Sequence, residues 1–276
     1  MPDESTYYEL TQDNDEHDLL SLIGPTTYPS HFHKKPEVTY MVKGQCVSEI
    51  NHTRYVAEPD DILFVSEYNP HSYNTTDDAL RYVFLADNNA RNDAIPLFNN
   101  KTFPCLLDNK IFNREKILPI LNEMLAYQRL SSPLSVSKKA QHLILKGYTD
   151  ILYGLFFMEY SDRLITVSKQ NEAVASILAY IDEHYAEDIT LEGLAGTFAY
   201  NKFYFSKLFN SCIGVNFSNY VNNVRIQKFV EKYDPNMRKN LLSLAFDVGF
   251  KSMPSFYRAF SRVYHCTPGE YFNLSE

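Results

Sequence analysis

The chain has 276 residues, enough for about two domains of ordinary size. Its 45% hydrophobic and 22% charged residues exclude a disordered or fibrous protein. The formal net charge of −8 excludes general binding to polyanions but leaves room for a local basic patch.

The sequence also indicates the compartment. Residues 1–18 are acidic and polar and lack the basic and apolar regions of a secretory signal. The most apolar stretch, residues 151–158, is far shorter than the roughly 20 residues that cross a bilayer. The cysteines are far apart and match neither a metal-binding nor a disulfide pattern. They are Cys46, Cys105, Cys212 and Cys266. We therefore predict a cytoplasmic protein with free thiols and no membrane segment.

Residues 26–85 predict a domain of short strands. Three β-branched or aromatic runs, at residues 38–42, 46–50 and 62–65, are separated by turn residues. Short strands at this spacing are typical of a β-sandwich or a small barrel. Residues 86–113 are rich in Asn, Asp and Pro, and we expect them to be mostly irregular.

Two helices are predicted next, within residues 114–160. Apolar residues recur at helical spacing from Ile117 to Leu125, and a second helix with Ser135 or Ser137 as its N-cap extends to about Glu159. The apolar side of the second helix is expected to comprise Leu143, Ile144, Ile151, Leu152 and Leu155. The two helices either cover the sheet or pair with a second copy of the chain.

Residues 172–276 are predicted to be helical and to contain a repeat. Leu194-Ala195 recurs as Leu244-Ala245, 50 residues later. Three aromatic residues, Phe205, Phe209 and Tyr220, recur 51 residues later as Phe256, Phe260 and Tyr271. Two copies of a helix-turn-helix unit are the simplest account. We expect Asn201 to cap the second helix of the first unit and Gly249 to supply the positive φ of the second turn.

The second helix of each unit is expected to bury one side and expose the other. In the first unit the expected buried residues are Tyr204, Phe205, Leu208 and Phe209. The expected exposed residues are Lys202, Phe203, Ser206, Lys207 and Asn210. In the second unit the expected buried residues are Phe256, Ala259, Phe260 and Val263. The expected exposed residues are Ser252, Met253, Ser255, Arg258 and Arg262.

Positive charge is concentrated around these two helices. Residues 172–199 hold six acidic residues and no Lys or Arg, whereas residues 200–265 hold ten Lys and Arg against three acidic residues. This distribution is expected for a surface that binds DNA phosphates and base edges. By periodicity alone, a plain helical bundle with solvated lysines is the alternative.

Several motifs follow one another in this part of the chain. They include Ile181-Asp182-Glu183-His184-Tyr185, Tyr204-Phe205-Ser206-Lys207-Leu208-Phe209, Leu244-Ala245-Phe246-Asp247-Val248-Gly249-Phe250 and Thr267-Pro268. In this order and spacing they resemble the C-terminal domain of AraC-type transcription regulators. The resemblance implies two helix-turn-helix units joined by a long helix, residues 217–233, with one DNA-contacting recognition helix in each unit. His265 and Phe229 depart from the family, which usually has Gly and Ala there, so we expect a left-handed His265 and extra room around Phe229.

The N-terminal half carries a second resemblance. Gly24, His31-Phe32-His33, Glu37 and Gly44 resemble the first motif of cupins, and Pro59-Asp60-Asp61 and Pro70-His71 with Asn74 resemble the second loosely. On a strand His31 and His33 point to the same side. With Glu37 and His71 they complete a possible set of three imidazoles and one carboxylate for a metal.

Sensor domains of AraC-type regulators often keep this pattern without a metal. The sequence therefore favours a polar effector pocket with no metal and no cofactor, and it leaves metal binding open. The residues predicted to bind the effector are His31, His33, Glu37, Tyr40, His71, Tyr73 and Arg81, with Tyr28 as a further wall residue.

The sequence as a whole predicts a two-domain α+β protein. The domains are a cupin-like β-barrel or sandwich at residues 1–113 with a helical extension at residues 114–160, a linker at residues 161–171, and an all-α double helix-turn-helix domain at residues 172–276. The predicted function is a homodimeric, sequence-specific transcription regulator, an activator or a repressor, which binds double-stranded DNA and works with RNA polymerase. A small molecule controls it, and sugars are a common effector class in the family. The alternative is a metal-dependent cupin enzyme, an oxygenase or isomerase, with a helical appendage.

Overall fold

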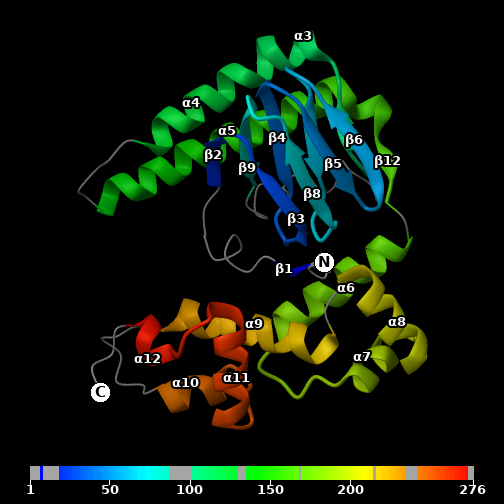
Figure 1. Ribbon diagram of the computed structural model, residues 1–276, viewed down its shortest axis with the longest axis vertical. Helices are drawn as coiled ribbons and strands as arrows, with labels where there is room; N and C mark the ends of the chain where they lie inside the picture. The colour runs from blue at the N-terminus through cyan, green and yellow to red at the C-terminus, as the bar shows by residue number, and fades with distance from the viewer. Residues whose placement is uncertain are drawn as a thin grey trace. The chain divides into compact units, whose positions relative to one another are not determined.

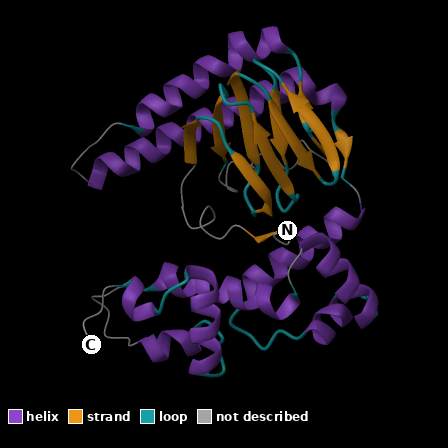
Figure 2. Cartoon of the chain, viewed as in Figure 1, coloured by secondary structure: helices purple, strands orange, loops and turns teal. Residues whose placement is uncertain are grey.

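The structure is a computed structural model that describes residues 7–8, 19–86, 101–129, 135–167, 169–213, 216–233 and 241–272. Contacts within the chain divide it into two units, and the boundary lies between Asn171 and Glu172. The strands from β2 onward belong to the first unit, whereas every element from α6 onward is a helix of the second unit (Figure 2).

Among the described residues of the first unit, antiparallel strands form two larger sheets and one two-stranded sheet (Figure 1). The strands of this unit are β2 (Leu19–Ile23), β3 (Thr27–Phe32), β4 (Glu37–Lys43), β5 (Cys46–Ile50), β6 (Thr53–Ala57), β7 (Ile62–Val65), β8 (His71–Thr75), β9 (Leu80–Leu85), β10 (Lys101–Thr102), β11 (Leu106–Leu107) and β12 (Ile165–Thr166), whereas β1 (Tyr7–Tyr8) is assigned to the second unit. In one sheet β3, β8, β5 and β6 are neighbours in that order, and in the other the order is β11, β7, β4, β9 and β2. The predicted cupin-like β-sandwich is therefore confirmed.

Strand β4 has both of its faces covered. Successive side chains of a strand point to opposite faces. Accordingly Val38 and Tyr40 belong to a core shared with helices, whereas Met41 belongs to a second core between the strands. Because Glu37 lies in the same alternation as Met41, its carboxylate points to the side away from the helices. This alternation determines which β4 residues reach the candidate site.

Helices pack on the face of the second sheet that carries Val38 and Tyr40 (Figure 1). They are α3 (Lys110–Phe112), the π-helical turn η1 (Asn113–Ile117), α4 (Leu118–Gln128), α5 (Ser135–Tyr160) and the 3₁₀ turn η2 (Ser161–Arg163). Leu121 and Met124 of α4 and Leu152 and Phe156 of α5 are fully buried in this core. The two predicted helices thus exist.

The predicted apolar side of α5 is only partly its buried side. Leu152 is buried and Leu155 half-buried, but Leu143, Ile144 and Ile151 are exposed. The helix carries apolar residues on two sides, and periodicity alone does not tell which of them packs on the sheet. The exposed side is therefore free to contact something other than the first unit's own sheet.

The prediction of an irregular segment at residues 86–113 is wrong in part. Among its described residues, β11 pairs with β7, and β10 pairs with β12 through Lys101 and Thr166. Strands of two residues carry too little pattern to be recognised from sequence, because a partner strand defines them. The second pairing places β12, which lies within the predicted linker at residues 161–171, beside the first unit's own chain.

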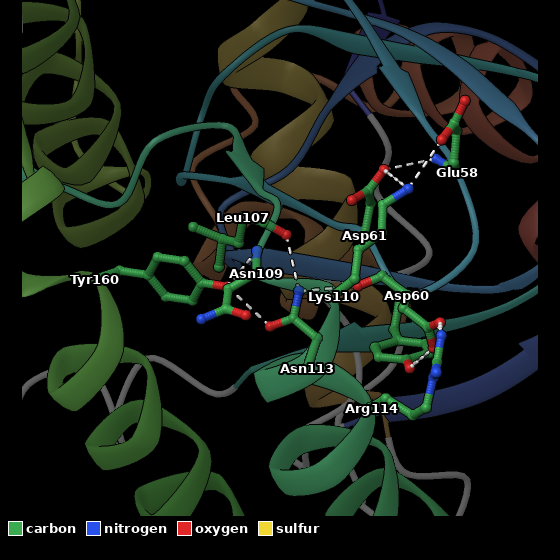
Figure 3. A network of polar contacts seen from close by, with 10 residues as sticks. Glu58, Asp60, Asp61, Leu107, Asn109, Lys110, Asn113, Arg114 and Tyr160 are labelled. Atoms are coloured by element: carbon green, nitrogen blue, oxygen red, sulfur yellow. Dashed lines mark hydrogen bonds and ion pairs between the residues drawn. The ribbon is translucent and has the colours of Figure 1, made fainter.

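A polar network joins the turn before β7 to the helices (Figure 3). Asp60 accepts hydrogen bonds from Tyr40 at 2.6 Å and from Arg114 of η1. The Asn113 amide donates to the Asp60 carbonyl at 2.9 Å, and the Tyr160 hydroxyl donates to the Asn113 amide oxygen at 2.9 Å. The network fixes the end of α5 and the side chain of Tyr40 to one turn of the sheet domain.

The described residues of the second unit form seven helices. They are α6 (Lys169–His184), α7 (Leu191–Thr197), α8 (Lys202–Ile213), α9 (Phe217–Lys232), α10 (Leu241–Asp247), α11 (Met253–Tyr264) and α12 (Pro268–Tyr271). The pairs α7–α8 and α10–α11 are the two helix-turn-helix units, and α9 is the predicted long helix between them. As predicted, the Asn201 side chain caps α8 by accepting from the Tyr204 amide at 2.8 Å.

The turn at Gly249 and the side chain of Arg225 meet at the loop that follows α6. Gly249 has the predicted positive φ, +96°, and a Cβ there would lie 2.9 Å from the backbone of Ala186 and from Arg225 Nε. Arg225 of α9 donates to the carbonyls of Tyr185 and Glu187, both at 2.8 Å. We call this interaction the Arg225 clamp. It connects α9, and the Gly249 turn of the second helix-turn-helix pair, to the loop that precedes α7.

Both departures from the family behave as predicted. His265 ends α11 in the left-handed conformation, with φ 55°. Phe229 is fully buried and has room because it packs against other rings, with centroids 4.6 Å from Phe256 and 6.1 Å from Phe260. The extra aromatic side chain therefore enlarges the core around α9 and α11 instead of disrupting it.

The structure also describes the thiols and the apolar character of the helices. Cys46, Cys105 and Cys266 are free thiols, and Cys212 lies outside the residues whose side chains the structure describes. Within the described part of the chain, we find no helix with the length and apolar character that crossing a membrane requires.

Candidate functional site

Helix α8 presents a basic and aromatic surface to solvent. Lys202, Phe203, Lys207 and Asn210 are exposed and Ser206 is half-buried. Phe203 is 88% exposed, an unusual position for an aromatic ring in a unit that buries most of its Phe side chains. All five predicted DNA-binding residues of the first helix-turn-helix unit thus lie on the accessible part of α8.

Tyr204 corrects the sequence prediction. It was expected on the buried side of α8, but 51% of it is exposed. Phe205, Leu208 and Phe209 already fill the buried side, so a fourth large side chain has no room there. Tyr257 of α11 is exposed as well. The sequence prediction placed Tyr204 on the wrong side and did not consider Tyr257, although the many aromatic residues in each helix indicated that some of them must be exposed.

Helix α11 presents a less open surface. Arg258 and Arg262 are exposed, whereas Ser252, Met253 and Ser255 are half-buried. Arg262 donates to the side-chain oxygens of Asn219 at 2.9 Å and Asn223 at 3.2 Å, both on α9. Its guanidinium therefore connects two helices. Among the predicted residues of α11, Arg258 is the basic group most available to a partner.

Four buried side chains converge between the sheets of the first unit. His31 lies on β3 and His33 directly follows that strand, while Glu37 begins β4 and His71 begins β8. One ligand atom from each residue lies within 4.8 Å of the other three. All four residues are at most 2% exposed. We call them the histidine cluster, and they are the predicted set of three imidazoles and one carboxylate.

Backbone carbonyls fix the orientation of the imidazole rings. The Nδ1 atoms of His31, His33 and His71 lie 3.0, 2.7 and 2.8 Å from the carbonyl oxygens of Pro29, Lys35 and Asn69. A carbonyl oxygen only accepts, so each Nδ1 carries a proton. In the neutral ring, the lone pair of Nε2 then points away from that carbonyl. This is the arrangement that holds metal-binding histidines in other proteins.

Glu37 is held as a carboxylate. Its Oε1 accepts from the Tyr73 hydroxyl at 2.6 Å and from Thr39 at 3.0 Å, while Oε2 lies 3.2 Å from His33 Nε2 and 3.6 Å from His71 Nε2. Burial opposes the charge, but the contacts with His33 and His71 hold the pKa of Glu37 well below its usual range. Burial, with the neighbouring His71, lowers the pKa of His31 to about 3.

The cluster has the electrostatic character of a cation site. At neutral pH His31 is uncharged and Glu37 negative, and the buried Nε2 of His71 has no hydrogen-bond partner among the described residues. With each Nδ1 proton directed at a carbonyl, the Nε2 atoms of His33 and His71 contact Glu37 favourably only when they carry an added proton or share a cation. Ligands of a tetrahedral zinc ion, with bonds of about 2.1 Å, lie about 3.4 Å apart, so the four ligand atoms, which lie within 4.8 Å of one another, would have to draw together around an ion. The residues therefore fit a divalent transition metal.

The remaining predicted effector residues divide into two groups. Tyr73 contacts the cluster through Glu37, Arg81 lies over the Tyr73 ring at 5.6 Å, and Tyr28 meets the His31 ring edge-on at 4.7 Å. The structure does not bring Tyr40 to the cluster, because its side chain points to the helix-facing side of β4 and binds Asp60. Thr39, on the Glu37 side of the same strand, is a contact that the sequence prediction missed.

Comparisons with known proteins agree with this division of the chain. The helix-turn-helix domain family matches residues 194–273, and the cupin domain family matches residues 21–86. An HTH-type transcriptional regulator of Bacillus subtilis, YbfI, is 20% identical over 229 residues, which cover 81% of this chain and 79% of YbfI. A Staphylococcus aureus HTH-type regulator is 30% identical over 102 residues, 37% of this chain but only 13% of the much longer relative.

A solved structure shares the fold. The fatty-acid-bound ToxT of Vibrio cholerae matches with a TM-score of 0.52 and 16% identity, over 95% of this chain and 99% of that one. The family matches, the regulator relatives and the shared fold confirm the resemblance that the motifs indicated. The chain is a DNA-binding transcription regulator of the AraC type, in which a helix-turn-helix domain follows a cupin-like ligand-binding domain.

Proposed function

We propose that a divalent transition metal in the histidine cluster is part of the signal that controls DNA binding by this regulator. The observation that carries the proposal is the convergence of three carbonyl-locked imidazoles and one carboxylate in a buried site. Imidazole and carboxylate ligands suit zinc, iron, manganese and cobalt. A metal bound there adds rigidity between β3, β4 and β8, because its ligands come from all three.

This proposal reverses the preference of the sequence for a metal-free pocket. The residue types were evident from the motif, but the three Nδ1–carbonyl contacts that orient the imidazole rings are visible only in the structure. We infer a binding protein and not an enzyme, because the relatives are transcription regulators. Residues 1–113 and 114–160 form the sensor domain and its extension, and the regulator acts in the cytoplasm on promoter DNA with RNA polymerase.

Cobalt titration of the full chain tests the metal. After treatment with a chelator, we expect one Co²⁺ per chain to give the visible absorption of a nitrogen- and oxygen-ligated ion, and we expect His33→Gln and His71→Gln to abolish it. His52→Gln is the matched control, since His52 is exposed and outside the cluster. Folding of each variant is checked by circular dichroism. Binding that survives both cluster variants, or no stoichiometric binding by the wild type, contradicts the proposal.

DNA binding then tests the regulatory role. The operator is obtained by selecting bound sequences from a random pool, with metal-loaded and with metal-free protein. We expect the affinity for the selected operator to differ between the two forms of the wild type but not between the two preparations of His33→Gln. Equal affinities in the wild type would leave the metal without a regulatory role.

We also propose that the chain is a homodimer and that the exposed side of α5 forms its interface. Residues on that side alternate at spacings of four and three, the pattern of a two-helix coiled coil. They are Ala140, Ile144, Gly147, Ile151, Gly154 and Met158. A Cβ at Gly147 or Gly154 would meet nothing within 4 Å, so a second helix has room to approach closely. We call this set the α5 seam.

A further inference from the structure

Arg81 is a buried guanidinium without a negative partner. It lies on β9, is 3% exposed, and donates from Nη1 to the carbonyl of Gly24 at 3.2 Å. Its Nε has no hydrogen-bond partner, and no carboxylate pairs with Arg81 in the part of the chain that the structure describes. Buried arginines are normally paired, because an uncompensated charge in the interior is costly.

A second unpartnered polar atom belongs to another neighbour of Tyr73. Ser48 of β5 is fully buried and its Oγ also lacks a hydrogen-bond partner. Ser48 stands opposite Tyr73 in the β5–β8 pairing, and Arg81 lies over the ring of the same tyrosine at 5.6 Å. Cross-strand neighbours have Cβ atoms about 5 Å apart. The two unpartnered atoms therefore flank one side chain.

None of the neighbouring acidic groups that the structure describes forms an ion pair with Arg81. Burial raises the pKa of the nearby Cys46 thiol to about 11, so the thiol is uncharged at neutral pH. The Tyr73 hydroxyl donates to Glu37 at 2.6 Å and is therefore directed at that carboxylate. Glu37 itself is occupied by Tyr73, Thr39 and the histidines. The ring of Tyr73 offers Arg81 only the weaker attraction of a cation for a π system.

We propose that Arg81 and Ser48 bind the carboxylate of a small acidic effector, beside the histidine cluster. Arginine binds carboxylates through two parallel N–H donors, and a serine hydroxyl supplies a third. The proposal deepens the proposed function, since it assigns the chemical class of the effector to the same domain. It differs from the sugar expected from the family, because a neutral hydroxyl cannot balance the Arg81 charge.

Tyr73 connects the proposed anion site to the metal site. Its ring lies under Arg81, and its hydroxyl donates to Glu37 at 2.6 Å. An anion that moves Arg81 therefore acts on the orientation of Tyr73 and through it on a metal ligand. Tyr73 is a positioning residue in this arrangement, since it touches both sites and belongs to neither set of ligands.

Thermal unfolding of the full chain tests the anion site with acetate as the probe. At equal ionic strength, we expect 50 mM sodium acetate to raise the Tm of the wild type by about 2–4 °C above sodium chloride with 50 mM acetamide. Arg81→Met keeps the volume and removes the charge, so the acetate-specific rise should disappear. Ser48→Ala keeps the charge and should reduce the rise, which provides a second variant if Arg81→Met unfolds.

The outcomes separate the proposals. No acetate-specific rise in the wild type, or the same rise in both variants, overturns the anion site. In anion-poor buffer, Arg81→Met should be at least as stable as the wild type, because an unpaired buried charge is removed; a lower Tm there assigns Arg81 a structural role and also overturns the proposal. Co²⁺ binding by Arg81→Met is expected to persist, so failure of the anion site leaves the metal proposal intact.

Discussion

Phe203 shows what a single exposed side chain contributes to recognition. An 88% exposed ring at the first turn of a recognition helix is available for the 5-methyl groups of thymines in the major groove. The corresponding position of the second helix-turn-helix pair is Pro254, which lies at the first turn of α11 and has no aromatic ring. The two recognition helices therefore favour different bases.

Replacing thymine by uracil in the selected operator tests this reading of Phe203. Loss of a contacted methyl should weaken wild-type binding by about fourfold, since a buried methylene contributes about 0.8 kcal/mol. Phe203→Ala should bind the thymine and uracil operators equally. Tyr204→Phe is the control and should keep the discrimination. An undiminished preference for thymine in Phe203→Ala would show that another residue contacts the methyl.

Single side chains also show how far the sequence goes. Lys207 and Asn210 are exposed as periodicity predicted, because the apolar residues around them leave one side of α8 free. Tyr204 could not be placed in this way, since a tyrosine suits either side. Tyr40 needed the strand alternation and the Asp60 contact, neither of which is local in sequence. The histidine cluster was found from its motif, but its carbonyl contacts were not.

At the scale of elements, the turn at Gly249 lends itself to a matched pair of variants. Gly249→Ala forces a Cβ into a left-handed residue that already touches Ala186 and Arg225, so we expect a loss of about 1–3 kcal/mol in unfolding free energy. Gly196→Ala lies within α7 with open space around it and should be neutral or stabilising by up to about 1 kcal/mol. Urea unfolding measures both. Equal effects would contradict the assigned strain.

The α5 seam gives the prediction for oligomeric state. Ile151→Glu puts a charge into the centre of the proposed interface, and sedimentation should show a monomer where the wild type is a dimer. Ile111→Glu on α3 is the control, because Ile111 is also an exposed isoleucine but lies outside the seam. Sequence alone identified α5 but not the seam, since only the packed structure shows which apolar side the sheet covers. A dimer that survives Ile151→Glu would exclude α5 as its interface.

At the scale of the molecule, two recognition helices in one unit predict the form of the binding site. They should occupy major-groove segments one helical turn apart, about 10–10.5 base pairs. Lys207→Ala should remove protection from one segment and Arg258→Ala from the other, each at a cost of about 1–3 kcal/mol. Lys43→Ala, an exposed lysine of the first unit, is the control. Footprinting measures the outcome, and a single protected segment would show that one unit stays outside the groove.

The Arg225 clamp should keep the spacing between the two recognition helices constant. Its two contacts to the backbone and the crowded turn at Gly249 do not depend on the DNA sequence, so α8 and α11 should stay at the same separation whichever bases they contact. A promoter can therefore lose affinity gradually through substitutions, one contact at a time. An inserted or deleted base pair between the segments changes both the spacing and the rotational phase at once. We therefore expect regulated promoters to vary in base sequence but to keep the number of base pairs between the two contacted segments.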